Sequence, residues 1–312
     1  MWLIVGTVPD VDFALSREGL ERAPCVEGHA LHLPDGRTLP VQRGTAALAA
    51  TAILTCMTRG VRPPALLLAG DTGRGDGSRE AYAWLETHLA SLAMSVGGLN
   101  GLTFHYLFPD VDWHNRVLLA VQALARRPLL VADAGYMYVA KMSGYADAYD
   151  LFTPDLGELA FLADEKAPHP FYTRGFLLAE DRDLPALLQR AQAHGNCPPN
   201  LVIKAAADHI VCDGRLLATV SEPCVPAMEC IGGTGDLVTG LVTAFLAEGM
   251  PLCRAILGAA RAARLLAARC QPTPATQISE LIVCLPQLLQ AAGQSLFSPP
   301  LCTAEAEQDE AS

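Results

Sequence analysis

Short apolar runs that alternate with helical segments are the feature that most constrains the fold of this chain. Each run is about as long as a strand and is bounded by turn residues, and segments of helical periodicity follow several of the runs. Because strands joined through helices run parallel and are covered on both faces, we predict an α/β fold with a mostly parallel central sheet and helices on both faces. The expected strands include residues 2–8, 65–69, 102–107, 128–132 and 200–205.

The composition is that of a chain with one large core. Of the 312 residues, 51% are hydrophobic and 18% are charged, which is ample for burying a sheet between helices. No repeat or change in composition divides residues 1–297, so we predict a single domain there. Residues 298–312 contain few apolar side chains and several carboxylates, and we expect a disordered acidic tail.

The net charge of −11 argues against nucleic acid as a partner. The chain contains three lysines, so any phosphate that it binds must be held by backbone N–H groups, a metal ion and a few isolated cations. We therefore expect small-molecule partners.

The cysteines and the N-terminus predict a cytoplasmic protein. Ten cysteines are spread from Cys25 to Cys302 without a C-x-x-C pair or a zinc-type spacing, and we interpret them as small hydrophobic residues in a reducing compartment. The first residues lack the basic region of a signal peptide, and the apolar helix expected at 45–57 is too short to cross a bilayer. We expect no membrane partner.

A glycine-rich turn precedes an apolar helix near the C-terminal third of the chain. Residues 230–240 read C-I-G-G-T-G-D-L-V-T-G. Unpaired N–H groups at a helix N-terminus attract anions, and the glycines allow a phosphate to approach the backbone closely. A carboxylate at Asp236 would repel that anion, but it could accept a proton from a hydroxyl that attacks a phosphate. The alternative is that Asp236 only caps the helix.

Two further candidates follow expected strands. The loop G-D-T-G-R-G-D-G-S, residues 70–78, lies between a strand and a helix, where open α/β sheets place ligands, and Gly70, Asp71 and Gly73 are candidate substrate contacts. Asp133 follows the run 128–132 and is a candidate for the same reason. A solvated surface loop is the alternative interpretation of residues 70–78.

Charged residues at four other positions are candidates. Asp155 and Glu158 are three residues apart in a first helical turn and could hold Mg²⁺ through water, although acidic residues are common at helix starts. Lys204 lies in an apolar run and therefore needs an anionic partner, either a carboxylate or a phosphate. Arg43, at the start of the helix expected at 45–59, could reach an anion or could be an incidental surface charge.

The order of these segments resembles the ribokinase-like superfamily. The segments are G-D-T-G-R-G-D, V-A-D-A, T-P-D-L-G-E-L-A-F-L, V-I-K-A-A-A-D and G-G-T-G-D-L-V-T-G, all within roughly residues 65–250. Among its members, the chain is most similar to the ATP- or ADP-dependent NAD(P)H-hydrate dehydratases. The resemblance implies a three-layer fold, nucleotide binding, Mg²⁺ and, as is common in this superfamily, a homo-oligomer.

The resemblance also implies roles for individual residues. Asp236 matches the catalytic base, Lys204 matches a lysine near the phosphates, and Glu158 matches a glutamate that helps to organise Mg²⁺, with Asp155 beside it. The residues implied to bind the nucleotide phosphates are Gly232, Gly233, Thr234 and Gly235.

The chain departs from the dehydratases in the segments that line their substrate pocket. Asp155 stands where they carry a histidine, Leu156 where they carry a proline, and the loop at residue 70 lacks their G-P-G-L-G pattern. Two alternatives to a dehydratase therefore stay open: a kinase of a sugar or another small alcohol, and a non-catalytic nucleotide-binding regulator.

Overall fold

The computed structural model describes residues 1–19, 23–169 and 180–298. Residues 299–312 of the expected tail lie outside these residues. In the described residues, a sheet of nine strands forms the centre of the molecule, in the order β12-β11-β10-β9-β8-β7-β1-β6-β2. These strands are β1 (Trp2–Val8), β2 (Ser16–Glu18), β6 (Ala65–Gly70), β7 (Gly101–His105), β8 (Leu129–Ala132), β9 (Leu151–Phe152), β10 (Leu201–Ile203), β11 (Asp208–Cys212) and β12 (Arg215–Val220).

The middle of the sheet is parallel, from β6 through β1, β7, β8 and β9 to β10. Strands β2, β11 and β12 run antiparallel at the two edges. All seven residues of β1 are buried, as expected for a strand covered on both faces. The carboxyl ends of the parallel strands consequently meet at one edge of the sheet.

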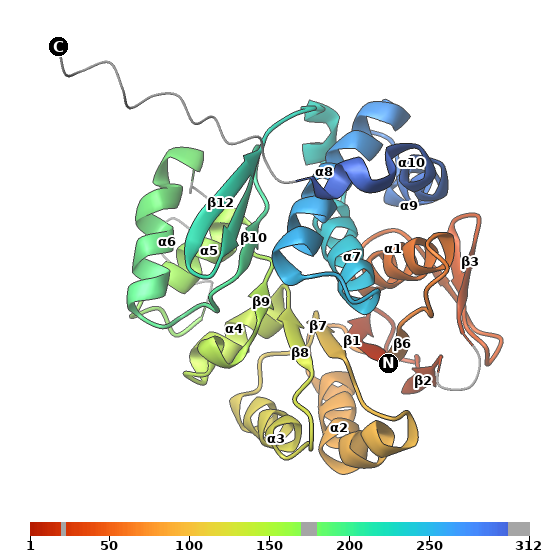
Figure 1. Ribbon diagram of the computed structural model, residues 1–312. Helices are drawn as coiled ribbons and strands as arrows, with labels where there is room; N and C mark the ends of the chain where they lie inside the picture. The colour runs from red at the N-terminus through yellow and green to blue at the C-terminus, as the bar shows by residue number, and fades with distance from the viewer. Residues whose placement is uncertain (20–22, 170–179, 299–312) are drawn as a thin grey trace.

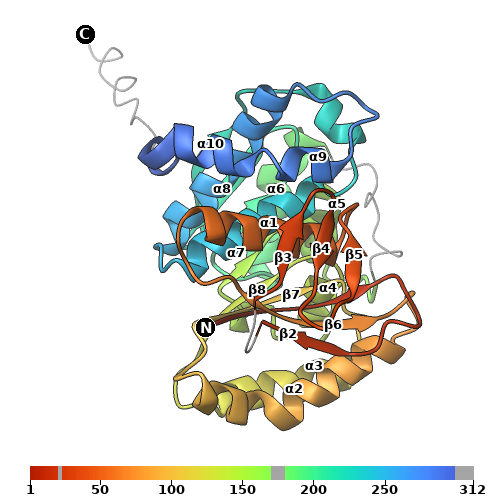
Figure 2. The same ribbon diagram turned by 90° about the vertical axis from the view of Figure 1, so that its right-hand side faces the viewer.

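Two layers of helices cover the sheet, and Figures 1 and 2 show them on opposite faces. Each layer packs on the sheet through its own cluster of buried apolar side chains. The predicted α/β fold is thus confirmed. One layer comprises α1 (Thr45–Thr58), α7 (Thr234–Ala247), α8 (Leu252–Cys270), α9 (Ile278–Ile282) and α10 (Leu285–Ala292), and the other comprises α2 (Asp76–Ser95), α3 (Val111–Gln122), α4 (Gly135–Met142), α5 (Leu156–Ala163) and α6 (Leu184–Ala193).

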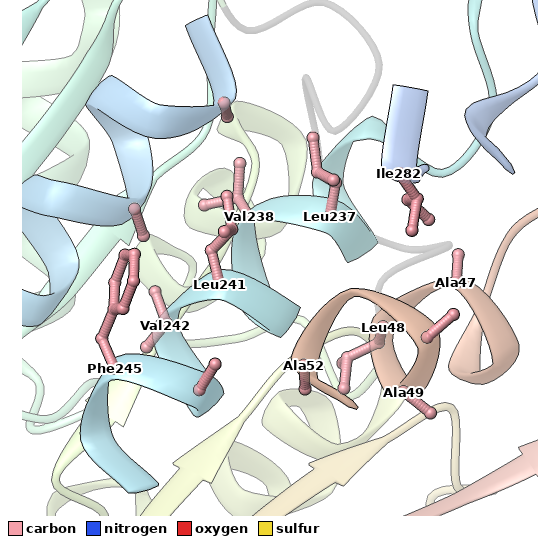
Figure 3. Packing of buried hydrophobic residues seen from close by; sticks show 14 of the residues in the cluster. Ala47, Leu48, Ala49, Ala52, Leu237, Val238, Leu241, Val242, Phe245 and Ile282 are labelled. Carbon is pink, nitrogen blue, oxygen red and sulfur yellow. The ribbon is translucent and has the colours of Figure 1, made fainter. Parts of the chain in front are cut away.

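Helices α1 and α7 pack side by side, and both contribute buried apolar side chains to one cluster (Figure 3). Gly240 allows the close approach, because an added Cβ atom there would lie 2.6 Å from the carbonyl oxygen of Leu48. The cap residues Gly44 and Gly233 begin the two helices at the same end of the pair, since Gly44 contacts the first turn of α7. Two helix N-termini therefore point toward one region above the sheet.

A small antiparallel sheet of β3 (Cys25–Glu27), β4 (Ala30–His32) and β5 (Thr38–Pro40) packs beside α1. It contains a hairpin of β4 and β5, which turns at residues 33–37. Leu31 and Leu39 point into the cluster that also holds α1 and α7, so this sheet extends the helical layer.

One expectation about the cysteines is wrong. Cys212 and Cys253 form a disulfide between β11 and α8, because the two elements bring their Cα atoms to 5.9 Å. Cys56 and Cys197 are buried free thiols, as expected of small hydrophobic residues. None of the helices in the described part of the chain combines the length and apolarity needed to span a bilayer.

Candidate active site

A cavity of about 380 Å³ opens at the carboxyl ends of the parallel strands. His105 ends β7, and Asp133, Asp155 and Lys204 follow β8, β9 and β10, so four adjacent strands each contribute a side chain. The first turn of α7, residues 233–236, forms another part of the wall. Ligands bind at this edge in open α/β sheets.

Asp236 is held by two hydrogen bonds on the inner side of this cavity. Its Oδ1 atom lies 2.9 Å from Nε2 of His105, and its Oδ2 atom accepts a hydrogen bond of 2.5 Å from the backbone N–H of Gly44. Nδ1 of His105 in turn lies 3.0 Å from Oγ1 of Thr45. The carboxylate thus has a fixed orientation at the N-termini of both α1 and α7.

Asp236 stays ionised although it is buried. Burial alone would raise its pKa, but the hydrogen bond with His105, followed by the Gly44 N–H and the charge of Lys204, lowers the pKa below the ordinary value. A carboxylate that is ionised, oriented and open to the cavity is able to accept a proton.

Lys204 and Asp133 form an ion pair on the floor of the cavity. The Nζ atom lies 2.9 and 3.1 Å from the two carboxylate oxygens, and the Thr239 hydroxyl donates to Oδ2 of Asp133 at 2.6 Å. Burial disfavours the ammonium, but the charges of Asp133 and Glu158 outweigh it and raise the pKa of Lys204. The anionic partner expected for Lys204 is therefore a carboxylate in the ligand-free protein.

Asp155 and Glu158 form a capping box at the start of α5. Asp155 accepts from the N–H of Glu158 at 2.7 Å, and Glu158 accepts from the N–H of Asp155 at 2.9 Å and from the Tyr138 hydroxyl at 2.9 Å. Burial and the neighbouring Asp155 charge raise the pKa of Glu158 to about 8. Both carboxyl groups line the cavity, so helix capping and ligand binding do not exclude one another here.

Helix α7 begins at Thr234, within the glycine turn itself. Gly233 has a φ of 97°, which glycine tolerates best, and an added Cβ there would lie 3.1 Å from Ile278. An added Cβ at Gly235 would lie 3.3 Å from Nζ of Lys204. The helix N-terminus, with its unpaired N–H groups, and one lysine thus flank the same space.

The opposite end of the cavity is mainly apolar. It lies between the segment 223–228 and the middle of α8. Arg264 on α8 holds this end together, because it bonds Asp208 at 2.8 Å and the backbone oxygens of Ser221 and Ala206. A slot of this kind suits a planar base. Its apolar lining residues are Pro223, Val225, Pro226, Met228, Ala263 and Ala267.

Several predicted site residues do not line the cavity. The carboxylate of Asp71 accepts hydrogen bonds from the N–H groups of Gly73, Arg74 and Gly75 and from Ser78, so it organises its own loop. Gly70 lies below that loop, where an added Cβ would collide with the carbonyl oxygen of Asp10.

Arg43 and Gly232 adjoin the cavity without lining it. Arg43 is exposed, and an added Cβ on Gly232 would lie 3.8 Å from its Cδ atom. The Arg43 side chain therefore lies next to the glycine turn.

Sequence reasoning missed His105, Gly44 and Tyr106. Residues 102–107 were expected to form a strand, which placed His105 inside the strand and not at its end, so the rule that singled out Asp133 did not reach it. The N–H of Gly44 leaves no signal in the sequence, since its partner is 192 residues away.

The cluster of His105, Asp133 and Asp236 meets the distance requirement of a metal site, with one potential ligand atom from each residue within 4.8 Å of the others. The ammonium of Lys204 already neutralises Asp133, and His105 already bonds Asp236. We therefore interpret the cluster as a hydrogen-bonded network.

Solved structures define the class of fold. The chain is similar to a ribokinase-like superfamily protein of Enterococcus faecalis, with a TM-score of 0.57, 15% identity, and coverage of 94% of this chain and 87% of that one. It is also similar to phosphofructokinase-2 of Escherichia coli (TM-score 0.51, 14% identity, 92% and 98% covered) and to pyridoxal kinase of Entamoeba histolytica (TM-score 0.51, 13% identity, 92% and 94% covered). The fold is the ribokinase-like fold.

The family is defined by a relative in sequence. The chain is 34% identical over 226 residues to the uncharacterized protein MJ1337 of Methanocaldococcus jannaschii, which covers 72% of this chain and 90% of that protein. The chain belongs to the same family as this archaeal protein. No protein-family model matches it.

Proposed function

We propose that this protein transfers a phosphoryl group from a nucleotide to a hydroxyl group of a small molecule, with Asp236 as the general base. The observation that carries the proposal is the position of Asp236, an ionised and oriented carboxylate in the first turn of a glycine-capped helix. A base beside an anion site is what this transfer requires.

The residues present fit a nucleotide and Mg²⁺. The N–H groups of the turn 233–235 and Lys204 would hold the phosphates, and the apolar slot beside α8 would hold the base. Glu158 and Asp155 would hold Mg²⁺, through water, once Glu158 gives up its proton. When bound, the nucleotide supplies the phosphoryl group and the ion neutralises its charge.

Residues of this chain would carry out the proton transfer and stabilise the charge on the phosphates. Asp236 accepts the proton of the substrate hydroxyl while the hydroxyl oxygen bonds to the transferred phosphorus and the bond from that phosphorus to the leaving phosphate oxygen breaks. The helix N-terminus and Lys204 stabilise the charge on the phosphates. Arg43, which is exposed beside Gly232, would contact the transferred group or an anionic substrate.

Two candidate functions differ in what happens to the substrate after the phosphoryl transfer. In a kinase of a sugar or another small alcohol, the phosphorylated product leaves; Asp155, in place of the dehydratase histidine, favours this candidate. In an NAD(P)H-hydrate dehydratase, the same transfer turns a hydroxyl into a leaving group and elimination restores the nicotinamide. The order of the five sequence motifs within roughly residues 65–250, which includes the G-G-T-G-D turn, favours this second candidate.

The test is an assay of purified wild-type protein with Mg²⁺ and ATP or ADP, against NADH hydrate and a panel of small alcohols. Recovery of NADH absorbance identifies a dehydratase, and a phosphorylated alcohol identifies a kinase. Asp236→Asn should keep nucleotide binding and lose turnover by at least about 100-fold. Asp213→Asn, at an exposed turn outside the cavity, is the matched control.

Two results would contradict the proposal. Full activity in the Asp236→Asn variant would show that Asp236 is not the general base. Tight nucleotide binding without transfer to any compound of the panel would favour the nucleotide-binding regulator instead.

A further inference from the structure

Tyr106 has an unusual backbone conformation at the mouth of the cavity. It follows β7 directly and has a φ of 50°, in the left-handed region that bulky residues rarely adopt. The Thr7 hydroxyl, on the neighbouring strand β1, donates to the carbonyl oxygen of Tyr106 at 2.6 Å. Strained residues of this kind cluster at ligand sites, where the surrounding structure maintains them.

The conformation presents the aromatic ring of Tyr106 to the cavity. The residue is 52% exposed, although its two neighbours in the chain, His105 and Leu107, are almost fully buried. Its ring packs edge-on against His105 with centroids 4.3 Å apart, and one ring edge lies beside the backbone of Gly44. His105 and Gly44 are the two residues that hold Asp236, so the ring adjoins the proposed base.

The polar groups next to this ring are already engaged. Both ring nitrogens of His105 have partners, Asp236 and Thr45. Asp133 accepts from Lys204, Thr239 and the N–H of Ala134. A polyol needs several free hydrogen-bonding side chains, whereas a planar ring needs an aromatic face. Tyr106 lines the cavity and is half exposed, so its ring is available to contact such a ligand.

We propose that Tyr106 is a stacking platform and that the substrate is an alcohol carried on a planar, heteroaromatic ring. This inference rests on the proposed function, because it places the reacting hydroxyl within reach of Asp236 while the attached ring stacks on Tyr106. Burial and then the nearby carboxylates, Asp236 foremost, raise the pKa of Tyr106 to about 12, so the phenol keeps its proton at neutral pH and does not repel the ring.

The test compares two groups of probes in wild-type protein with Mg²⁺ and ATP. Pyridoxine and a hydroxymethylpyrimidine are ring alcohols, and ribose and fructose 6-phosphate are not aromatic. Turnover is measured by phosphorylated product, and binding of each probe is measured by calorimetry in Asp236→Asn, which does not require transfer.

Two variants separate the ring from the backbone. Tyr106→Asn removes the ring but keeps a residue that tolerates the left-handed conformation, and Tyr106→Phe removes only the hydroxyl. Stacking on an aromatic side chain is worth roughly a 5- to 150-fold change in affinity. We expect a ring alcohol to bind and react, Tyr106→Asn to raise its KM within that range with a smaller change in kcat, and Tyr106→Phe to change KM less.

Tyr145→Asn, at an exposed tyrosine outside the cavity, is the control. ATP should raise the melting temperature of every variant equally, which shows that each one folds. The inference is overturned if only the sugars react, or if Tyr106→Asn binds the ring alcohols as tightly as wild type does. Sugar transfer that disappears in Asp236→Asn would overturn this inference and leave the proposed function intact, whereas full activity in Asp236→Asn would overturn the proposed function.

Discussion

Nε2 of His105 lies 2.9 Å from Oδ1 of Asp236, and the histidine side chain is completely buried. Since Asp236 is ionised, the short contact is best satisfied when Nε2 carries a proton and donates it to the carboxylate. Nδ1 can then accept from the Thr45 hydroxyl at 3.0 Å. Through this bond the end of β7 holds the proposed base, which belongs to α7.

Replacing His105 should therefore shift the pH dependence of the reaction. In His105→Leu, burial is no longer offset by the histidine, so the pKa of Asp236 rises. A hydrogen bond to a charged group is worth about 1.5–3 kcal/mol, so the acidic limb of the kcat/KM profile should move to higher pH by roughly one to two units. The measurement is a pH–rate profile.

His105→Gln keeps an amide N–H that can reach Asp236, and it should return the limb most of the way to its wild-type position. An acidic limb that stays unchanged in His105→Leu would show that His105 does not set the pKa of the base. Loss of activity at every pH, without a shift, would indicate a purely structural role.

A second prediction concerns the ion pair of Lys204 and Asp133. Lys204→Met leaves the Asp133 carboxylate buried without its cation, which typically costs about 3–5 kcal/mol of unfolding free energy. The double variant Lys204→Met with Asp133→Asn removes both charges and should recover a large part of that loss. Urea unfolding of the two single variants and the double variant completes the cycle. Strictly additive losses would mean that the two residues do not interact.

Much of the fold could be predicted from the sequence, because apolar runs and helical periodicity are local signals. The glycine turn, Asp236, Lys204 and Asp133 were also recognisable, since each follows or begins an element with a marked pattern. The structure brings these residues into one cavity.

The remainder depends on spatial order that local patterns do not contain. β7 lies beside β8 and also beside β1, the first strand of the chain, and this arrangement places His105 and Thr45 together near Asp236. Asp71 is also predicted as a ligand contact, and in the structure its carboxylate accepts hydrogen bonds from the N–H groups of its own loop. A rule based on strand ends cannot distinguish a side chain that lines the cavity from one that holds its own loop in place.

A third prediction tests the glycine turn. Gly235→Ala places a methyl group where the phosphates would approach, near Nζ of Lys204. Alanine is a better helix former than glycine by about 1 kcal/mol, so the ligand-free protein should melt at the same or a higher temperature. Loss of one charge-assisted backbone contact should weaken nucleotide binding by roughly 10- to 100-fold. Calorimetry with ADP and ATP would measure this, and unchanged affinity would place the phosphates elsewhere.

The last prediction uses the raised pKa of Glu158, which lies at about 8 in the folded protein against an ordinary value of 4.5. Between these two values the unfolded chain has lost the proton that the folded protein still binds, so the unfolding free energy of wild type must fall as the pH rises through this window, and it levels off above it. Glu158→Gln does not titrate, and glutamine can keep the capping box through its amide oxygen while its amide N–H donates to the Tyr138 hydroxyl oxygen. Relative to wild type, Glu158→Gln should therefore gain stability between about pH 5 and about pH 8 in urea unfolding. Mg²⁺ should oppose this fall in wild type alone, because binding at Glu158 requires its carboxylate form and releases the proton. A stability difference between the two proteins that is independent of pH would show that Glu158 is already ionised in the folded state.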